Sequence, residues 1–154
     1  MTDSVETRLA AAGYSLPVAA APVASYVPTV IAGDIMHISG QISFRDGAIV
    51  TGRVGDDLDV AAGQDAARLC GLMLLAQMKA ALGSLDRVER IVKLGVFVCS
   101  TPDCTAQPEV ANGASDLMVL AFGDAGRHAR AAVSVPALPR GAAVEIDAIV
   151  HIRA

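Results

Sequence analysis

The chain of 154 residues contains no tryptophan, and aromatic side chains make up only 3% of it. Charged residues are also few, at 18%, whereas hydrophobic residues reach 53%. This balance excludes an intrinsically disordered chain, which combines low hydrophobicity with high charge. Because aromatics are scarce, the core must be built from aliphatic side chains. A small chain this apolar is expected to bury part of its surface against copies of itself, so we expect an oligomer.

Cysteines, basic residues and long apolar runs are few as well. The three cysteines have no disulfide-framework spacing, and no apolar run is long enough to cross a bilayer. The first residues, MTDSVETR, carry acidic side chains where a secretory signal would carry basic ones. The net charge of −4 argues against nucleic acid as a general partner. We therefore expect a cytoplasmic protein with reduced thiols and no membrane or nucleic-acid partner.

We expect one domain over residues 1–154, in which residues 1–25 form an N-terminal helix and an extended arm. Residues 3–12 suit a short helix with Asp3 as the N-cap and Gly13 as the stop. The arm that follows cannot be a regular helix because it contains three prolines, Pro17, Pro22 and Pro28.

Beyond the arm, the spacing of hydrophobic residues predicts two helices and a set of strands. The helices run over 60–82, closed by Gly83, and over 108–122, closed by Gly123. The strands begin at Ile35 and continue, after a hairpin turn at 45–47, with 48–50, 90–100, 128–136 and 143–153. The order β-β-α-β-α-β-β predicts an α+β fold, with a mixed sheet and two helices on one of its faces.

Alternation along the strands assigns each side chain to one face of this sheet. The face toward the helices should carry Ala131, Val133 and Val135 from one strand and Val144, Ile146, Ala148, Val150 and Ile152 from the next. The opposite face should carry the polar positions Ser39, Gln41, Arg130, Ser134, Glu145 and Asp147. His128 shares a strand face with Arg130. Three separate segments thus place polar groups on the side of the sheet away from the helices.

Arg130 and Glu145 are the two residues best suited to chemistry. A guanidinium offers a planar, bidentate match to a carboxylate and can fix the orientation of a small acid. A carboxylate near a reacting atom can activate water as a general base. From composition alone, a solvated charge or an ion pair between these two residues explains them better than a site does.

Two blocks of sequence and one further residue give the chain a family resemblance. The C-terminal block HARAAVSVPALPRGAAVE (128–145) contains Arg130-x-x-Val133-x-Val135-x-x-Leu138-Pro139, with Glu145 at its end. The N-terminal block YVPTVIAGDIMHISGQ (26–41) has Ser-Gly-Gln as its core, and Asn112 matches a third position. In these blocks, their order and their spacing, the chain resembles the reactive intermediate deaminase (Rid) family, the YjgF-like family formerly labelled endoribonuclease L-PSP.

The resemblance implies a chorismate-mutase-like subunit that assembles into a homotrimer with ligand clefts between subunits. It implies hydrolysis of reactive imines and enamines, such as 2-imino acids, to keto acids and ammonia, without a metal or organic cofactor. Arg130 would bind the substrate carboxylate, and Glu145 would orient the attacking water and help to move its proton. The remaining contacts implied for the substrate are Tyr26, Ser39, Gly40 and Asn112.

The sequence also departs from the family pattern and leaves other functions open. Ala132 stands where the best-known members carry a cysteine, and one extra residue separates Asn112 from Arg130. A small basic cluster surrounds Arg130, and some Rid-like proteins have been labelled ribonucleases, but aromatic residues for stacking on RNA are absent from it. The three histidines lack metal-ligand spacing. The alternative to an imine deaminase is a trimeric module that binds a small carboxylate without converting it.

Overall fold

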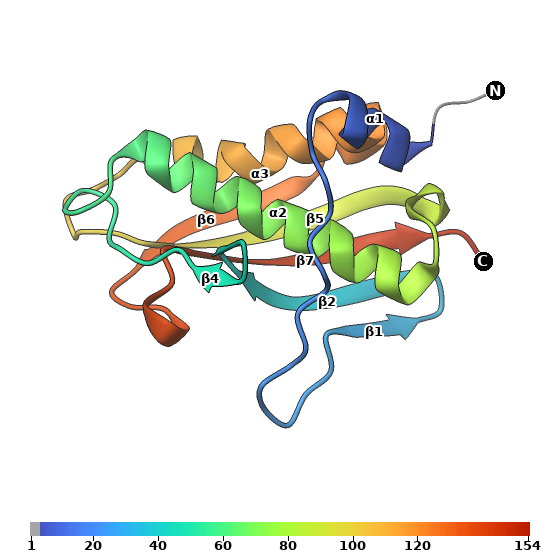
Figure 1. Ribbon diagram of the computed structural model, residues 1–154, viewed down its shortest axis with the longest axis horizontal. Coiled ribbons are helices and arrows are strands. Elements are labelled where there is room, and N and C mark those ends of the chain that lie inside the picture. Colours follow the sequence, from blue (N-terminus) through green and yellow to red (C-terminus); the bar gives the residue numbers. More distant parts are fainter. Residues whose placement is uncertain (1–3) are drawn as a thin grey trace.

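A computed structural model describes residues 4–154, which form one five-stranded sheet covered on one face by helices (Figure 1). The helices are α1 (Val5–Ala11), α2 (Val60–Leu82) and α3 (Gln107–Phe122). The strands of the sheet are β1 (Thr29–Ala32), β2 (Ile35–Ile42), β5 (Val88–Cys99), β6 (Ala129–Val135) and β7 (Val144–Ile152). A separate hairpin consists of β3 (Phe44–Arg45) and β4 (Ala48–Ile49), and single 3-10 turns are η1 (Leu85–Arg87), η2 (Gly123–Gly126) and η3 (Pro139–Gly141).

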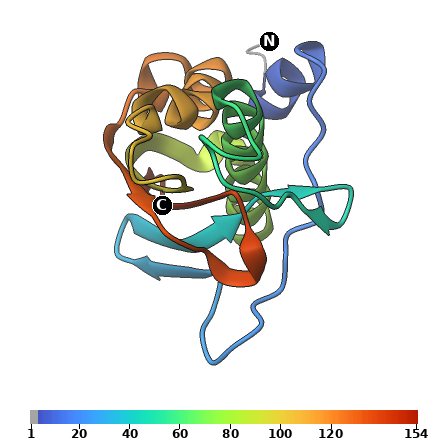
Figure 2. The same ribbon diagram turned by 90° about the vertical axis from the view of Figure 1, so that its left-hand side faces the viewer.

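The strand order is β1-β2-β7-β5-β6, with β6 parallel to β5 and every other neighbouring pair antiparallel. The predicted mixed α+β sheet is therefore confirmed. Figure 2 shows α2 and α3 side by side above the sheet, with the opposite face of the sheet uncovered. One strand was not predicted: β1 forms a hairpin with β2 through a turn at Gly33, whose φ of 64° suits glycine.

Helix α2 begins and ends where its sequence signals place it. The Asp59 side chain accepts a hydrogen bond from the backbone N–H of Ala62 at 2.8 Å, and Gly83 closes the helix with a φ of 81°. Ser4 is the N-cap of α1, while the predicted cap, Asp3, lies outside the described residues. Residues 13–28 then form the extended arm, which runs past α2 to β1 (Figure 1). The Gln77 side chain of α2 donates a hydrogen bond to the backbone oxygen of Ala20 in this arm.

The aliphatic core lies between α2, α3 and the sheet. On β7 the predicted core-facing set is buried: Val144, Ile146, Ala148, Val150 and Ile152. Small residues let the two long helices approach closely, because a Cβ added at Gly113 of α3 would lie 2.0 Å from the backbone oxygen of Gln64 on α2. The two helices therefore hold a fixed position relative to each other and to the sheet.

The predicted faces of β6 are wrong. Arg130 is level with the buried Leu94 of β5, and it reaches α3, so its side lies toward the helices. Val133, expected in the core, is 47% exposed on the opposite side. One face of this edge strand is entirely alanine and valine, and the other carries Arg130 and Ser134. The usual rule that the apolar face is buried therefore fails here, because Arg130 bonds to α3 and the valine face is left open.

A β-bulge also reverses part of β2. Ile38 pairs with Ala148 but Gln41 pairs with Ile146, so three steps along β2 match two along β7. Gln41, expected on the open face, is therefore buried at 7% exposure, where its Oε1 accepts a hydrogen bond from Gln77 of α2 at 3.2 Å. The extra residue moves Gly40 and Ile42 to the open face beside β7.

Candidate functional site

A cavity of about 270 Å³ lies where the arm passes the end of β2. Three of the predicted site residues line it, Tyr26 from the arm, Gly40 from the bulge and Glu145 from β7. The rest of its wall is mostly apolar, with Ala20, Ala21, Pro22, Val23, Pro28, Gln41, Ile42, Phe44, Pro139 and Arg140. Residues distant in sequence thus surround the Glu145 carboxylate and the Tyr26 phenol.

Glu145 is the chemical centre of this cavity. Burial raises the pKa of its carboxyl above the ordinary value, and the nearby Asp147 carboxylate raises this pKa further. A Cβ added at Gly40 would lie 2.7 Å from Glu145 Oε2, so only glycine lets the β2 backbone pass this close to the carboxylate. The Glu145 carboxylate makes no hydrogen bond with any other residue of 4–154. Its oxygens are available to a water or a substrate.

Ser39 lies next to this cavity but points into a neighbouring hollow. Its hydroxyl donates a hydrogen bond to the backbone oxygen of Val27 at 2.8 Å and so ties the arm to β2. The hollow measures about 360 Å³ on the open face of the sheet and is also lined by His37, Lys93 and Asp147. Gly40 borders both spaces.

Sequence reasoning missed Arg140, which lines the Glu145 cavity from the turn before β7. Its backbone is left-handed, with φ 57° and ψ 20°, a conformation that costs energy for any residue with a Cβ. Such strain is commonest at functional sites. The only sequence signal was the Pro-Arg-Gly turn between two strands.

Arg130 and Asn112 form a second cluster, at the edge of the sheet next to α3. Arg130 Nη1 donates a hydrogen bond to Asn112 Oδ1 at 2.9 Å and another to Ser115 Oγ at 3.1 Å. Ser115 Oγ also lies 2.9 Å from His128 Nε2, and His128 Nδ1 lies 2.6 Å from the backbone oxygen of Gly126. The sequence places His128 beside Arg130 but does not reveal Ser115, which joins them.

The two clusters do not meet within one chain. Arg130 and Ala148 are both level with Leu94, so Arg130 is separated from Glu145 by two strand spacings and three residues along the sheet. These spacings amount to about 10 Å in each direction. The two side chains also point to opposite faces, so the expectation that Ser39, Arg130 and Glu145 share one face is wrong for Arg130.

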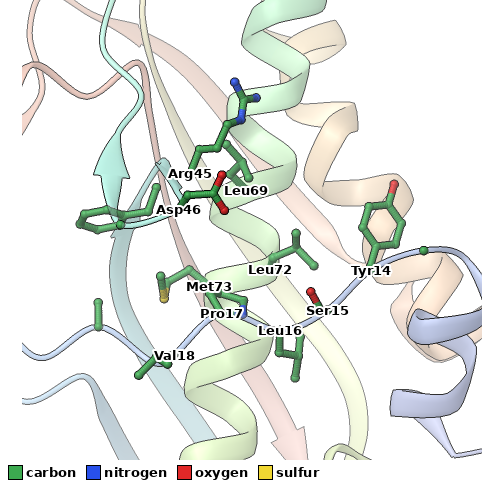
Figure 3. A pocket seen from close by; sticks show the side chains of 14 residues that line it. Tyr14, Ser15, Leu16, Pro17, Val18, Arg45, Asp46, Leu69, Leu72 and Met73 are labelled. Carbon is green, nitrogen blue, oxygen red and sulfur yellow. The ribbon is translucent and has the colours of Figure 1, made fainter.

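A third cavity, of about 610 Å³, contains none of the predicted site residues (Figure 3). It lies between the arm at Tyr14 to Val18, the hairpin at Arg45 and Asp46, and the outer face of α2 at Leu69, Leu72 and Met73. Among residues 4–154, no group of three or more His, Cys, Asp or Glu side chains is placed to hold a metal ion. In the same residues, no helix is both long and apolar enough to span a membrane.

Residues 6–149 match the model of the family described as "YjgF/chorismate_mutase-like, putative endoribonuclease". The chain belongs to this family. It is 53% identical over 150 residues to Protein TCP17 of Trypanosoma cruzi, covering 96% of this chain and 94% of that one.

Two further relatives bear on structure and activity. The crystal structure of Atu1372 from Agrobacterium tumefaciens, a protein of unknown function, is 50% identical with a TM-score of 0.91, over 97% of this chain and 92% of that one. A 2-iminobutanoate/2-iminopropanoate deaminase of Dermatophagoides farinae is 29% identical over 141 residues, covering 90% of this chain and 94% of that protein. The similarity to this deaminase extends over nearly the whole of both chains.

Proposed function

We propose that this protein hydrolyses small 2-imino acids, or their enamine forms, to keto acids and ammonia. The observation that carries the proposal is Glu145, a partly buried carboxylate without a protein partner among the described residues, in a cavity with Tyr26. The relative described as a 2-iminobutanoate/2-iminopropanoate deaminase supports the same chemistry.

Glu145 would act as the base and then as the acid. A protonated imine is already electrophilic, so the site needs a positioned water and a group that moves protons. Glu145 accepts a proton from the water as its oxygen attacks the imine carbon, which gives a carbinolamine. Glu145 then gives this proton to the amine nitrogen. As ammonia leaves, the hydroxyl group passes its proton to the Glu145 carboxylate and becomes the carbonyl of the keto acid, and the released ammonia takes that proton from Glu145. The raised pKa of Glu145 favours this exchange, because its carboxyl holds a proton more readily than an ordinary one.

Arg130 would bind the substrate carboxylate from a neighbouring subunit. Within one chain it lies on the wrong face for the Glu145 cavity, but it lies on β6 at the edge of the sheet. The exposed Val133 on the open side of β6 gives this edge an apolar surface suited to another copy. A homotrimer with clefts between subunits, in which one subunit supplies Arg130 and the next supplies Glu145, would complete the site.

The test follows the loss of freshly generated 2-iminobutanoate and 2-iminopropanoate. Wild type is expected to accelerate hydrolysis, and Glu145→Ala to lower kcat by about a hundredfold or more, as loss of a general base does. Arg130→Ala should act mainly on KM. Absence of acceleration by wild type on a range of 2-imino acids, with keto acids still bound, would leave a non-catalytic carboxylate-binding module instead. If the protein is a monomer in solution, it has no cleft between subunits, and the proposed shared site is wrong.

A further inference from the structure

The guanidinium of Arg130 is held by one nitrogen, and its other edge is free. Nη1 makes both of its hydrogen bonds, to Asn112 Oδ1 and Ser115 Oγ. Within residues 4–154, Nε and Nη2 donate to no protein atom. A carboxylate takes two parallel N–H bonds from one edge of a guanidinium. The Nε and Nη2 edge is therefore the one available for a bidentate ligand.

In the hydrogen bonds that link Arg130, Ser115, His128 and Gly126, each residue donates to the next one. The backbone oxygen of Gly126 can only accept, so His128 Nδ1 carries the proton of the 2.6 Å bond between them. Burial lowers the pKa of His128, an effect only partly opposed by the bond to Gly126, and the charge of Arg130 lowers this pKa further. His128 is thus neutral near pH 7, and its Nε2 accepts the hydroxyl proton of Ser115. The Ser115 oxygen is left to accept from Arg130.

Close packing of the backbone fixes the position of Gly126, whose oxygen is the last acceptor in this chain of hydrogen bonds. A Cβ added at Gly126 would lie 2.1 Å from the backbone oxygen of Met118, so η2 is in tight contact with α3 at a position where only glycine fits. The carbonyl that sets the tautomer of His128 is therefore held against the same helix that carries Asn112 and Ser115.

We infer that Ser115 and His128 are positioning residues that orient Arg130 for a substrate carboxylate, through the directed chain Arg130 to Ser115 to His128 to Gly126. Asn112 holds the same guanidinium nitrogen from the next turn of α3. This inference rests on the proposed function, in which Arg130 is the carboxylate ligand. Neither Ser115 nor His128 lines any of the three cavities described above, so both act through Arg130.

Steady-state kinetics on 2-iminobutanoate and binding of 2-oxobutanoate, followed by NMR titration, test the inference. Ser115→Ala and His128→Phe should each raise KM and the Kd of the keto acid by about tenfold, as expected for one hydrogen bond to a charged group, with kcat within about twofold of wild type. Ser115→Thr keeps the hydroxyl and should restore both values. In His128→Gln the amide oxygen can still accept a hydrogen bond from Ser115, so KM and Kd should stay close to the wild-type values.

Asn112→Asp supplies a variant at an exposed position, which should fold even where the others do not. Its carboxylate would pair with Arg130 and compete with the substrate, so KM and Kd should rise at least as much as in Ser115→Ala. In wild type, 15N NMR should find His128 as the neutral tautomer protonated on Nδ1.

The outcomes separate this inference from the proposed function. If Arg130→Ala raises KM and Kd while folded Ser115→Ala and Asn112→Asp leave both unchanged, the positioning role is wrong and the carboxylate site stands. A His128 protonated on Nε2 would also overturn the direction of the chain. If Arg130→Ala itself changes neither value, the proposed role of Arg130 fails, and the inference fails with it.

Discussion

The Glu145 cavity and the Arg130 cluster are built in opposite ways. Around Glu145, an arm, a bulge and a turn from distant parts of the sequence surround a carboxylate that no described residue binds. Around Arg130, residues of α3, the end of η2 and the start of β6 form a chain of hydrogen bonds that holds Nη1 of the guanidinium. One region leaves its reactive group open, and the other fixes its charged group in place.

The difference matches what each half of a hydrolytic site requires. A general base must exchange protons with water and substrate, so permanent partners would compete with its task. A carboxylate-binding arginine gains from being held beforehand, because less side-chain freedom is lost when the ligand binds. Since the two regions lie on opposite faces of the sheet, each subunit would contribute one kind of group to each of two clefts.

The largest change in activity is expected when a variant of the Arg130 cluster is mixed with a variant of the Glu145 cavity. If the site lies between the subunits of a homotrimer, Arg130→Ala and Glu145→Ala should each be nearly inactive when assayed at a substrate concentration far below the KM of Arg130→Ala. Unfolded together in equal amounts and refolded, they should form mixed trimers in which about a quarter of the clefts have both residues intact, because each partner of a cleft is drawn independently. Activity should therefore return to about a quarter of wild type, measured on 2-iminobutanoate.

The control is the double variant, Arg130→Ala with Glu145→Ala on one chain, refolded with wild type. At equal amounts it should leave a quarter of the clefts intact, those between two wild-type subunits, whereas half of the activity would remain if both residues acted within one chain. If the mixture of single variants stays inactive although mass spectrometry detects mixed trimers, both residues act within one chain and the contrast between the two regions has no functional meaning.

Gly40→Ala should have a smaller effect, confined to the Glu145 region. The new methyl group would meet Glu145 Oε2 at 2.7 Å and push the carboxylate from its position. We expect kcat to fall by about ten- to a hundredfold, since misplacement of a catalytic group by about 1 Å has such effects. The Kd of 2-oxobutanoate, which depends on Arg130, should change less.

Gly95→Ala is the matched control on the same open face. Its methyl group would meet the Asp147 carboxylate at 2.4 Å, but neither Gly95 nor Asp147 lines the Glu145 cavity. It should lower the melting temperature about as much as Gly40→Ala while kcat stays closer to wild type. Equal losses of kcat in the two variants would mean that general crowding of the face, and not Glu145, limits turnover.

The sequence predicts the parts of this fold where polar and apolar residues contrast. The strand from Val144 to Ile152 alternates regularly, and its buried face was predicted correctly. The long helix was predicted from Asp59 to Gly83 because both caps are chemically distinctive. Tyr26, Gly40 and Glu145, which the family resemblance names as site residues, line one cavity.

The rest depends on features that alternation cannot reveal. On β6 the face with Val133 is the more apolar one, yet it is the open face, and Arg130 on the other face bonds to α3, so alternation predicts the wrong side for Arg130. On β2 one bulge residue moved Gln41 into the core, and nothing before Gly40 marks it. The link between Arg130 and His128 needed Ser115, whose three-residue spacing from Asn112 places both on one helix face but does not identify their partner.

The smallest predicted effect concerns stability and the pH at which Glu145 titrates. Its pKa is raised in the folded chain above the 4.5 of an ordinary glutamate, so between these two values the folded state binds more protons than the unfolded state. Stability is therefore lost as the pH rises from 4.5 through the folded pKa, and the cost is absent at lower pH. Glu145→Gln removes this cost, and at pH 7 it should raise the melting temperature by about 1–3 °C, with no gain near pH 4. A fall in melting temperature at pH 7 would mean that the charged carboxylate stabilises the fold, and the contrast between an open Glu145 and a fixed Arg130 would be lost.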